Sequence, residues 1–213
     1  LCADSVLREL VGDLKERGQW DNTMLIVTSD HGEEFFEHGK WGHERNLLPE
    51  KLRIPLLIKL PSQRHGGLRV DGLASHVDIA PTMLSALDVP DPVRLPGFDL
   101  LSGVPANLRT GRQFHFAEYR RGQLVQRDPP SETAGPPHYS VISEQHQYIV
   151  EGQENGDGKE YLFDLQEDAA AQNNLAEALP EVRERYAAIV RVRCRAGYTM
   201  AVNGDGEPHR YSG

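Results

Sequence analysis

The side chains best suited to chemistry follow a short apolar segment, Met24–Val27, which predicts a buried strand. Asp30 and His31 stand side by side directly after it, and Gly32 lets the backbone turn away. In open α/β sheets, ligands bind where strands end. A carboxylate oxygen beside an imidazole nitrogen suits a divalent metal ion. We therefore predict that Asp30 and His31 are metal ligands, with a simple Asp-Gly turn as the alternative.

Two further histidines, His38 and His43, follow within twelve residues of His31. An imidazole can donate a hydrogen bond or act as a general acid near neutral pH. The surrounding segment, Gly32–Asn46, reads as a loop of fifteen residues, and loops of this length are often functional. We predict that His43 and His38 contact the substrate and that His43 has a catalytic role. The alternative is that both are surface histidines.

Helices and strands must hold these residues in place, and the hydrophobic pattern predicts where they lie. Apolar residues recur at helical spacing over residues 3–17, which predicts an amphipathic helix. Strands are predicted at residues 23–28 and 54–60, and a second helix at residues 78–87 with Asp78 as its N-cap. This order is typical of a parallel α/β sheet: a helix, a short loop, a buried strand and a loop that carries the candidate site residues.

The pattern changes after a connection rich in proline and glycine, residues 88–110, which is the predicted boundary. Four short strands and a last helix follow, at residues 113–119, 139–143, 147–151, 160–165 and 175–195. Such short runs suit an antiparallel sheet packed by a helix. We predict two domains, an α/β portion at residues 1–105 and a C-terminal subdomain at residues 106–213.

Composition limits the class of protein. The chain has 213 residues, of which 38% are hydrophobic and 26% charged, as in soluble globular proteins. The net charge of −9 argues against a nucleic-acid partner. No apolar run reaches the roughly 18 residues that span a bilayer, so no membrane segment is predicted in this chain. The chain begins with Leu1 rather than Met, inside the predicted helix, so the natural start is expected upstream. Localisation (cytoplasmic, periplasmic or secreted) and oligomeric state stay open.

Four ordered blocks resemble the second half of sulfatases, which belong to the alkaline phosphatase superfamily. They read Thr-Ser-Asp-His-Gly-Glu (28–33), Glu-His-Gly-Lys-Trp-Gly-His (37–43), Arg-Ile-Pro-Leu-Leu-Ile-Lys-Leu-Pro (53–61) and Ser-His-Val-Asp-Ile-Ala-Pro-Thr (75–82). A fifth block lies at residues 160–175. The resemblance implies an α/β fold. This chain would form part of an alkaline-phosphatase-like sandwich, with a mainly parallel sheet flanked by helices, plus a small C-terminal antiparallel sheet packed by a helix.

The same resemblance implies a metal-dependent hydrolase of sulfate or phosphate esters, acting on a small molecule or a glycan. Asp30 and His31 would complete the site of one divalent metal ion, calcium or manganese first and zinc as a third choice. His43 stands where many sulfatases carry lysine after Trp-Gly. Relatives that act on phosphoryl groups often have histidine there, so the resemblance leaves the type of ester open.

The nucleophile is the part of the resemblance that this chain lacks. Sulfatases use a cysteine, converted to formylglycine, within Cys-x-Pro-Ser-Arg. The only partial likeness, Cys2-Ala-Asp-Ser-Val6, lacks both the proline and the arginine, and Cys194 lies in the last predicted helix. We therefore expect an N-terminal half to supply the formylglycine, and the chain to be inactive alone. Two alternatives remain: a transferase of phosphoglycerol or phosphoethanolamine groups, and a non-catalytic binding module that keeps the fold.

Overall fold

The computed structural model describes residues 2–42, 46–91, 93–102, 112–119, 137–152 and 158–195. The chain divides into two compact units, one of residues 1–30 and 54–69 and one of residues 31–53 and 70–213. None of the helices in the described ranges is long and apolar enough to cross a membrane. The predicted boundary between residues 105 and 106 falls among residues outside these ranges, so it stays a prediction.

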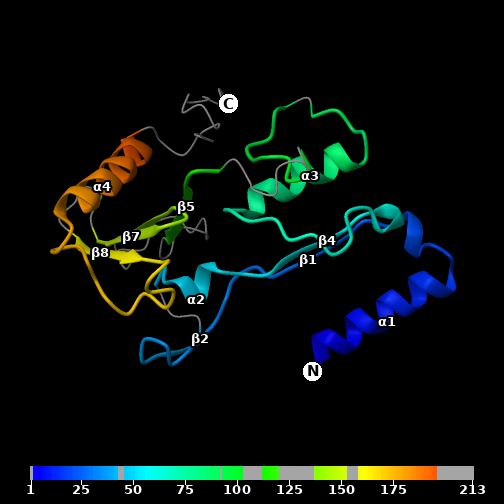
Figure 1. Cartoon of the computed structure of the whole chain (residues 1–213), viewed down its shortest axis with the longest axis horizontal. Helices are drawn as coiled ribbons and strands as arrows, with labels where there is room; N and C mark the ends of the chain where they lie inside the picture. Colours follow the sequence, from blue (N-terminus) through cyan, green and yellow to red (C-terminus); the bar gives the residue numbers. More distant parts are fainter. Residues whose placement is uncertain are drawn as a thin grey trace, which may run out of the picture. The chain divides into compact units, whose positions relative to one another are not determined.

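The first unit contains the predicted N-terminal helix and two paired strands (Figure 1). The helix is α1 (Cys2–Glu16), and the strands are β1 (Leu25–Thr28) and β4 (Leu56–Lys59). Short 3-10 turns, η1 (Trp20–Asn22) and η2 (Pro61–Gln63), precede β1 and follow β4. Helix and strands lie where the hydrophobic periodicity predicts them, because local patterning dominates over such short elements.

The direction of the strand pair differs from the prediction. β1 and β4 run antiparallel, with Leu25 opposite Lys59 and Thr28 opposite Leu56. Parallel neighbours need a crossover connection that usually contains a full helix. The described part of residues 29–55 holds only two-residue strands and one four-residue helix. These two strands therefore form no parallel pair, although the α/β class of the chain is confirmed.

The entry to β1 is fixed by a lysine from β4. The Lys59 ammonium donates to the carbonyl oxygens of Trp20 and Thr23, the latter at 2.9 Å. The same group lies 4.4 Å from the centre of the Trp20 ring, a cation–π contact. Because these contacts hold the residues before β1, they also fix the direction in which the strand approaches Asp30.

The second unit is organised around a four-stranded antiparallel sheet, in the order β5-β6-β7-β8. The strands are β5 (His115–Tyr119), β6 (His138–Ile142), β7 (His146–Glu151) and β8 (Lys159–Asp164), and helix α4 (Pro180–Arg195) packs on one face (Figure 1). Val141, Tyr148 and Leu162 face α4 and are in contact with Tyr186 and Val190. The predicted antiparallel sheet packed by a helix is confirmed.

The opposite face of this sheet is also covered. Ile149 and Phe163 pack there with Leu47, which precedes helix α2 (Pro49–Leu52). The buried Gln147 side chain donates to the Leu47 carbonyl at 2.6 Å and to Ser140 Oγ at 3.0 Å. Successive residues of β7 thus point to opposite cores, as the period of two in a strand requires. The contacts of Gln147 fix the segment that carries α2 on the sheet.

The segment predicted as a plain loop, Gly32–Asn46, contains a small hairpin. Its strands are β2 (Glu34–Phe35) and β3 (Trp41–Gly42), with Glu34 opposite Gly42 and Phe35 opposite Trp41. Gly39 has a φ of +82°, a backbone conformation that favours glycine. The prediction missed the hairpin because two-residue strands are too short to show an alternating pattern.

A buried aspartate organises the segment around helix α3 (Ile79–Ala86). Asp78 is 0% exposed, and its carboxylate accepts the amides of Ser75 and Phe98, each at 2.8 Å. It also pairs with the Arg112 guanidinium. Asp78 occupies the N-cap position of α3, as predicted, but its side chain makes no capping hydrogen bond to that helix. Its carboxylate instead closes a capping box that begins at Ser75, the N-cap of the preceding 3-10 turn (His76–Asp78).

We expect Asp78→Ala to lower the free energy of unfolding by about 3 kcal/mol, because it leaves the Arg112 charge and two amides without their buried acceptor. Urea denaturation followed by circular dichroism measures this loss. Asp71→Ala, at an exposed carboxylate, is the control and should change stability by less than about 0.5 kcal/mol. Equal effects of the two substitutions would contradict the structural role of Asp78.

Candidate functional site

The two predicted metal ligands lie directly after β1, and both side chains are exposed. Ser29 Oγ donates to Asp30 Oδ1 at 3.4 Å, while His31 Nδ1 lies 2.8 Å from the Gly32 carbonyl oxygen. A carbonyl only accepts, so Nδ1 must carry the proton and the lone pair of the neutral ring is at Nε2. Metal-binding histidines typically have this tautomer, fixed by a backbone carbonyl. The donor chemistry of His31 and Asp30 thus fits a divalent ion.

Gly32 fixes the backbone immediately after this pair. Its amide donates to the Lys51 carbonyl at 2.8 Å. A β-carbon at position 32 would overlap the carbonyl oxygen of Glu50, so every larger residue would force the two segments apart. The glycine that the sequence suggested as a turn residue is therefore also a point of close backbone approach to α2.

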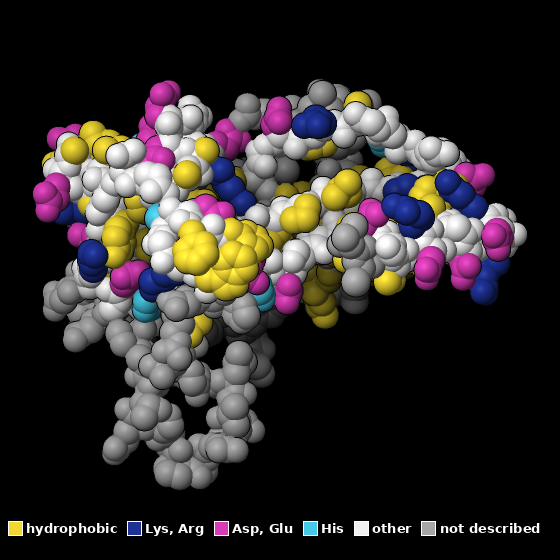
Figure 2. Space-filling model, turned by 90° about the horizontal axis from the view of Figure 1, so that it is seen from below, with side chains coloured by type: hydrophobic (Ala, Val, Ile, Leu, Met, Phe, Trp, Pro, Cys, Tyr) yellow, Lys and Arg dark blue, Asp and Glu magenta, His cyan; other side chains and the backbone are white. Residues whose placement is uncertain are grey.

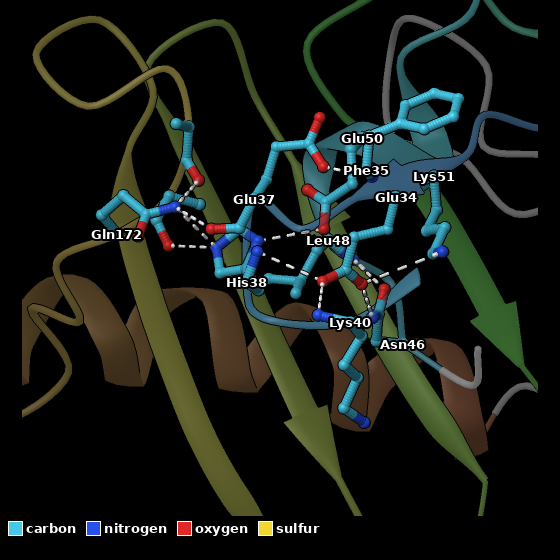
Figure 3. A network of polar contacts seen from close by, with 12 residues as sticks. Glu34, Phe35, Glu37, His38, Lys40, Asn46, Leu48, Glu50, Lys51 and Gln172 are labelled. Atoms are coloured by element: carbon cyan, nitrogen blue, oxygen red, sulfur yellow. Dashed lines mark hydrogen bonds and ion pairs between the residues drawn. The ribbon is translucent and has the colours of Figure 1, made fainter. Parts of the chain in front are cut away.

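The hairpin that follows is closed by a buried carboxylate (Figure 3). Glu34 is 0% exposed, and its Oε1 accepts the backbone amides of Lys40 at 3.0 Å and His38 at 3.2 Å. Its Oε2 accepts Asn46 Nδ2 at 3.2 Å and lies 3.9 Å from the Lys51 ammonium. Burial raises the pKa of Glu34, but the hydrogen bonds and the Lys51 charge outweigh it and lower the pKa below its usual value.

His38 links this hairpin to a segment far along the chain. Its Nδ1 lies 3.0 Å from Glu50 Oε1, and its Nε2 lies 3.0 Å from the carbonyl oxygen of Ala171. Gln172 adds a hydrogen bond from its side-chain amide to the Glu37 carbonyl at 3.0 Å (Figure 3). Burial lowers the pKa of His38, but the Ala171 carbonyl and the Glu50 and Glu34 carboxylates more than offset this and raise it. An imidazolium flanked by two acceptors is the form that these contacts favour.

Glu34, His38 and Glu50 offer ligand atoms within 4.8 Å of one another, which by distance alone resembles a metal site. Their hydrogen bonds argue otherwise. Both oxygens of Glu34 already accept donors, and both nitrogens of His38 face acceptors. An ion would have to displace the protons and amides that satisfy these buried groups. The cluster is better described as an anchor for the hairpin, and the metal-binding role of Asp30 and His31 stays a prediction.

The predicted roles of the two remaining site residues, His43 and His38, are not tested by the structure. His43 lies outside the described residues, so its catalytic and substrate-binding roles stay predictions. Substrate binding by His38 also stays a prediction, while its contacts support a positioning role. Sequence reasoning did not find the part played by Glu34 and Glu50, because nothing in the local pattern marks an acidic loop residue as buried. The one available signal was the fifth sequence block, residues 160–175, because it includes Ala171, whose carbonyl contacts His38.

Comparison with known proteins assigns these features to one family. Residues 1–89 match the protein family described as Sulfatase. The chain belongs to the sulfatase family. Arylsulfatase K of Bos taurus is 31% identical over 194 residues, covering 85% of this chain and 33% of that protein. The N-acetylglucosamine-6-O-sulfatase of Bacteroides thetaiotaomicron is 29% identical, covering 87% of this chain and 34% of that protein.

A third relative is the multifunctional alkaline phosphatase superfamily protein PehA of Trinickia caryophylli. It is 38% identical over 121 residues, which are 53% of this chain and 23% of that protein. This sulfatase-family chain therefore spans about a third or less of the length of these relatives.

Solved structures share the fold. The phosphonate monoester hydrolase of Agrobacterium radiobacter superposes with a TM-score of 0.72 at 23% identity, covering 99% of this chain and 43% of that one. A protein solved with its substrate D-glucosamine-2-N,6-O-disulfate gives a TM-score of 0.70 at 22% identity, covering 90% and 38%. These likenesses confirm the α/β fold predicted from the sequence blocks.

The raised pKa of His38 makes hairpin stability depend on pH. The contribution of His38 is fully present below the pKa of an unfolded histidine, about 6.5, and is lost as pH rises through the higher folded value. We expect the protection factors of the hairpin amides against hydrogen exchange to fall over that rise. His38→Ala should remove this fall in protection. His65→Asn is the control, at an exposed histidine whose positive φ of 60° asparagine tolerates. An unchanged pH dependence in His38→Ala would refute the anchor.

Proposed function

We propose that this chain is part of a metal-dependent hydrolase of sulfate or phosphate esters, whose nucleophile comes from a part of the protein that this sequence does not contain. The observation that carries the proposal is the adjacent Asp30 and His31 at the exposed end of β1, with the His31 tautomer set by the Gly32 carbonyl. The sulfatase family match over residues 1–89 supports it. The absence of Cys-x-Pro-Ser-Arg from the sequence is the reason for seeking the nucleophile elsewhere.

Asp30 and His31 would hold one divalent ion, together with ligands from outside this chain. Calcium and manganese suit an oxygen-rich set of partners, and zinc would suit a set richer in nitrogen. When bound, such an ion would neutralise oxygens of the ester and orient them for attack. His31 contributes its Nε2 lone pair, and Asp30 contributes negative charge that offsets the charge of the ion. The hydrogen bond from the Gly32 amide to the Lys51 carbonyl fixes the backbone directly after His31.

His43 is proposed to contact the transferred group or to protonate the leaving oxygen. Lysine is common at this place in sulfatases. Because this chain has histidine there, the substrate of the full protein can be a phosphate ester as well as a sulfate ester. A relative named as multifunctional within the alkaline phosphatase superfamily is consistent with either. Relatives named as an arylsulfatase and as an N-acetylglucosamine-6-O-sulfatase favour a small-molecule or glycan sulfate. The two alternative functions are a transferase and a non-catalytic binding module.

The first test replaces a metal ligand in the full-length protein that contains this chain. We expect Asp30→Asn to lower metal content and to reduce kcat toward 4-nitrophenyl sulfate and N-acetylglucosamine 6-sulfate by about 100-fold or more. Metal analysis by mass spectrometry and steady-state kinetics measure the two effects. Asp21→Asn, at an exposed aspartate of η1, is the matched control. Full metal content together with full turnover in Asp30→Asn would refute the assignment of Asp30 as a metal ligand. A wild-type protein that binds metal but hydrolyses neither ester would favour the non-catalytic module.

The second test concerns the type of ester. We expect His43→Lys to raise the ratio of sulfate to phosphate monoester turnover by about tenfold, because lysine stays charged near neutral pH whereas histidine is mostly neutral. The ratio is measured with 4-nitrophenyl sulfate and 4-nitrophenyl phosphate, and His65→Asn serves as control. A ratio that does not move would remove His43 from the proposed contact with the transferred group.

A further inference from the structure

His38 has both a hydrogen-bond acceptor and a hydrogen-bond donor within reach of one ring nitrogen (Figure 3). Its Nε2 lies 3.0 Å from the Ala171 carbonyl oxygen and 3.3 Å from the side-chain nitrogen of Gln172. The other ring nitrogen, Nδ1, lies 3.0 Å from Glu50 Oε1. An imidazole in these surroundings can find a partner for Nε2 whether or not that nitrogen carries a proton.

The protonated ring uses both acceptors. An imidazolium carries a proton on each nitrogen, so Nδ1 donates to the Glu50 carboxylate and Nε2 donates to the Ala171 carbonyl. These bonds join the turn of the hairpin to α2 and to the C-terminal block, residues 160–175. In this state the Gln172 side-chain amide donates elsewhere, to the carbonyl oxygens of Glu37 at 3.0 Å and Ala170 at 3.3 Å.

The neutral ring must give up one of its two bonds, because it has a single proton. The proton is held best at Nδ1, where the acceptor is a charged carboxylate. The lone pair of Nε2 then faces the lone pairs of the Ala171 carbonyl, whereas the Gln172 amide can donate to it. Loss of the proton therefore replaces a bond to the backbone of the block by a bond from an exposed side chain.

The Ala171 carbonyl is directed at His38 by an unusual backbone conformation. Ala171 has a φ of +52°, in the left-handed region that residues with a β-carbon rarely adopt. Its amide donates to the Asp168 carbonyl at 3.0 Å, and its side chain is buried. A strained backbone persists only where surrounding contacts hold it. The bond from His38 is one of those contacts, so its loss also weakens the turn that presents the carbonyl.

The balance of charges around His38 favours the protonated ring. These charges belong to the hairpin, to α2 and the residue after it, and to the C-terminal block: Glu34, Glu37, Lys40, Glu50, Lys51, Arg53 and Asp168. Burial lowers the pKa of His38, but the Ala171 carbonyl and the Glu50 and Glu34 carboxylates outweigh it and raise the pKa. The net charge is −9, and Figure 2 shows Asp and Glu side chains over the described residues of one face, a field that also favours a bound proton.

We propose that His38 and Gln172 form a pH-operated latch, in which protonated His38 holds the hairpin β2–β3 to the C-terminal block and deprotonation loosens it. Above the transition the bond from Gln172 replaces the bond to Ala171, and the hairpin stays tied to α2 alone. His38 is in this role a positioning residue. The consequence for catalysis rests on the proposed function: turnover by the full-length protein should fall as the latch opens with rising pH.

The test reverses the charge at position 172 in the full-length protein. Gln172→Glu puts an anionic acceptor beside Nε2 and stabilises the imidazolium, whereas Gln172→Lys puts a cationic donor there and stabilises the neutral ring. Hydrogen–deuterium exchange with mass spectrometry, corrected for intrinsic exchange between about pH 5 and pH 9, gives the pH at which hairpin peptides lose half of their protection. We expect this midpoint to rise by about 0.5 pH unit or more in Gln172→Glu and to fall by about as much in Gln172→Lys.

Matched controls and a second readout separate the latch from a general effect of charge. Gln166→Glu and Gln166→Lys make the same changes at another exposed position of the C-terminal block, and should leave the midpoint unchanged. The alkaline limb of the kcat profile with 4-nitrophenyl sulfate should move in the same direction as the midpoint in each Gln172 variant. A merely structural role of Gln172 would not move the two variants in opposite directions.

The latch is overturned if the midpoint stays fixed, or moves the same way, in both Gln172 variants, or if the Gln166 controls shift it equally. A kcat limb that stays fixed while the exchange midpoint moves would overturn the control of turnover. If the wild type hydrolyses no ester, the proposed function fails separately, and the exchange midpoint still tests the latch.

Discussion

The burial of the Glu34 carboxylate is the constraint on which the rest of the described site depends. A fully buried charge is stable only when hydrogen bonds and an opposite charge satisfy it. The amides of His38 and Lys40, the Asn46 side chain and the Lys51 ammonium do so together. These partners come from the turn of the hairpin, from the segment after it and from α2. The carboxylate can therefore be buried only when the hairpin is closed against α2, and the closed hairpin in turn fixes the turn that carries His38.

The family block at residues 160–175 acquires a physical meaning from the same contacts. Asp168 Oδ2 accepts the Asn173 amide at 2.7 Å, and the Asn174 side chain bridges β8 by accepting from Leu162 and donating to the Glu160 carbonyl. This turn holds the Ala171 carbonyl in position for His38. A chain of polar contacts thus runs from the sheet through the C-terminal block to His38 in the hairpin.

Proximity of ligand atoms alone does not identify a metal site, because the protein itself can satisfy those atoms. Glu34, His38 and Glu50 are close together, but their donors and acceptors are satisfied by the protein. His31 has its proton held at Nδ1 by the Gly32 carbonyl, which puts the lone pair of the neutral ring at Nε2. The free energy of metal binding must exceed that of the contacts it replaces. That condition disfavours the compact buried group, whose hydrogen bonds an ion would have to replace.

The sequence by itself determined the features that depend on local pattern: α1 from its apolar repeat, the strands of the antiparallel sheet from their alternation, the adjacent Asp30 and His31, and the ordered blocks that identify the family. Tertiary structure decided the rest, namely the antiparallel direction of β1 and β4, the hairpin, and the burial of Glu34. It also decided the bond between His38 and Ala171, which are 133 residues apart in the chain. The physical reason is that strand direction, burial and the protonation of a histidine depend on partners brought together from distant positions. A window of neighbouring residues carries no information about which partners those are.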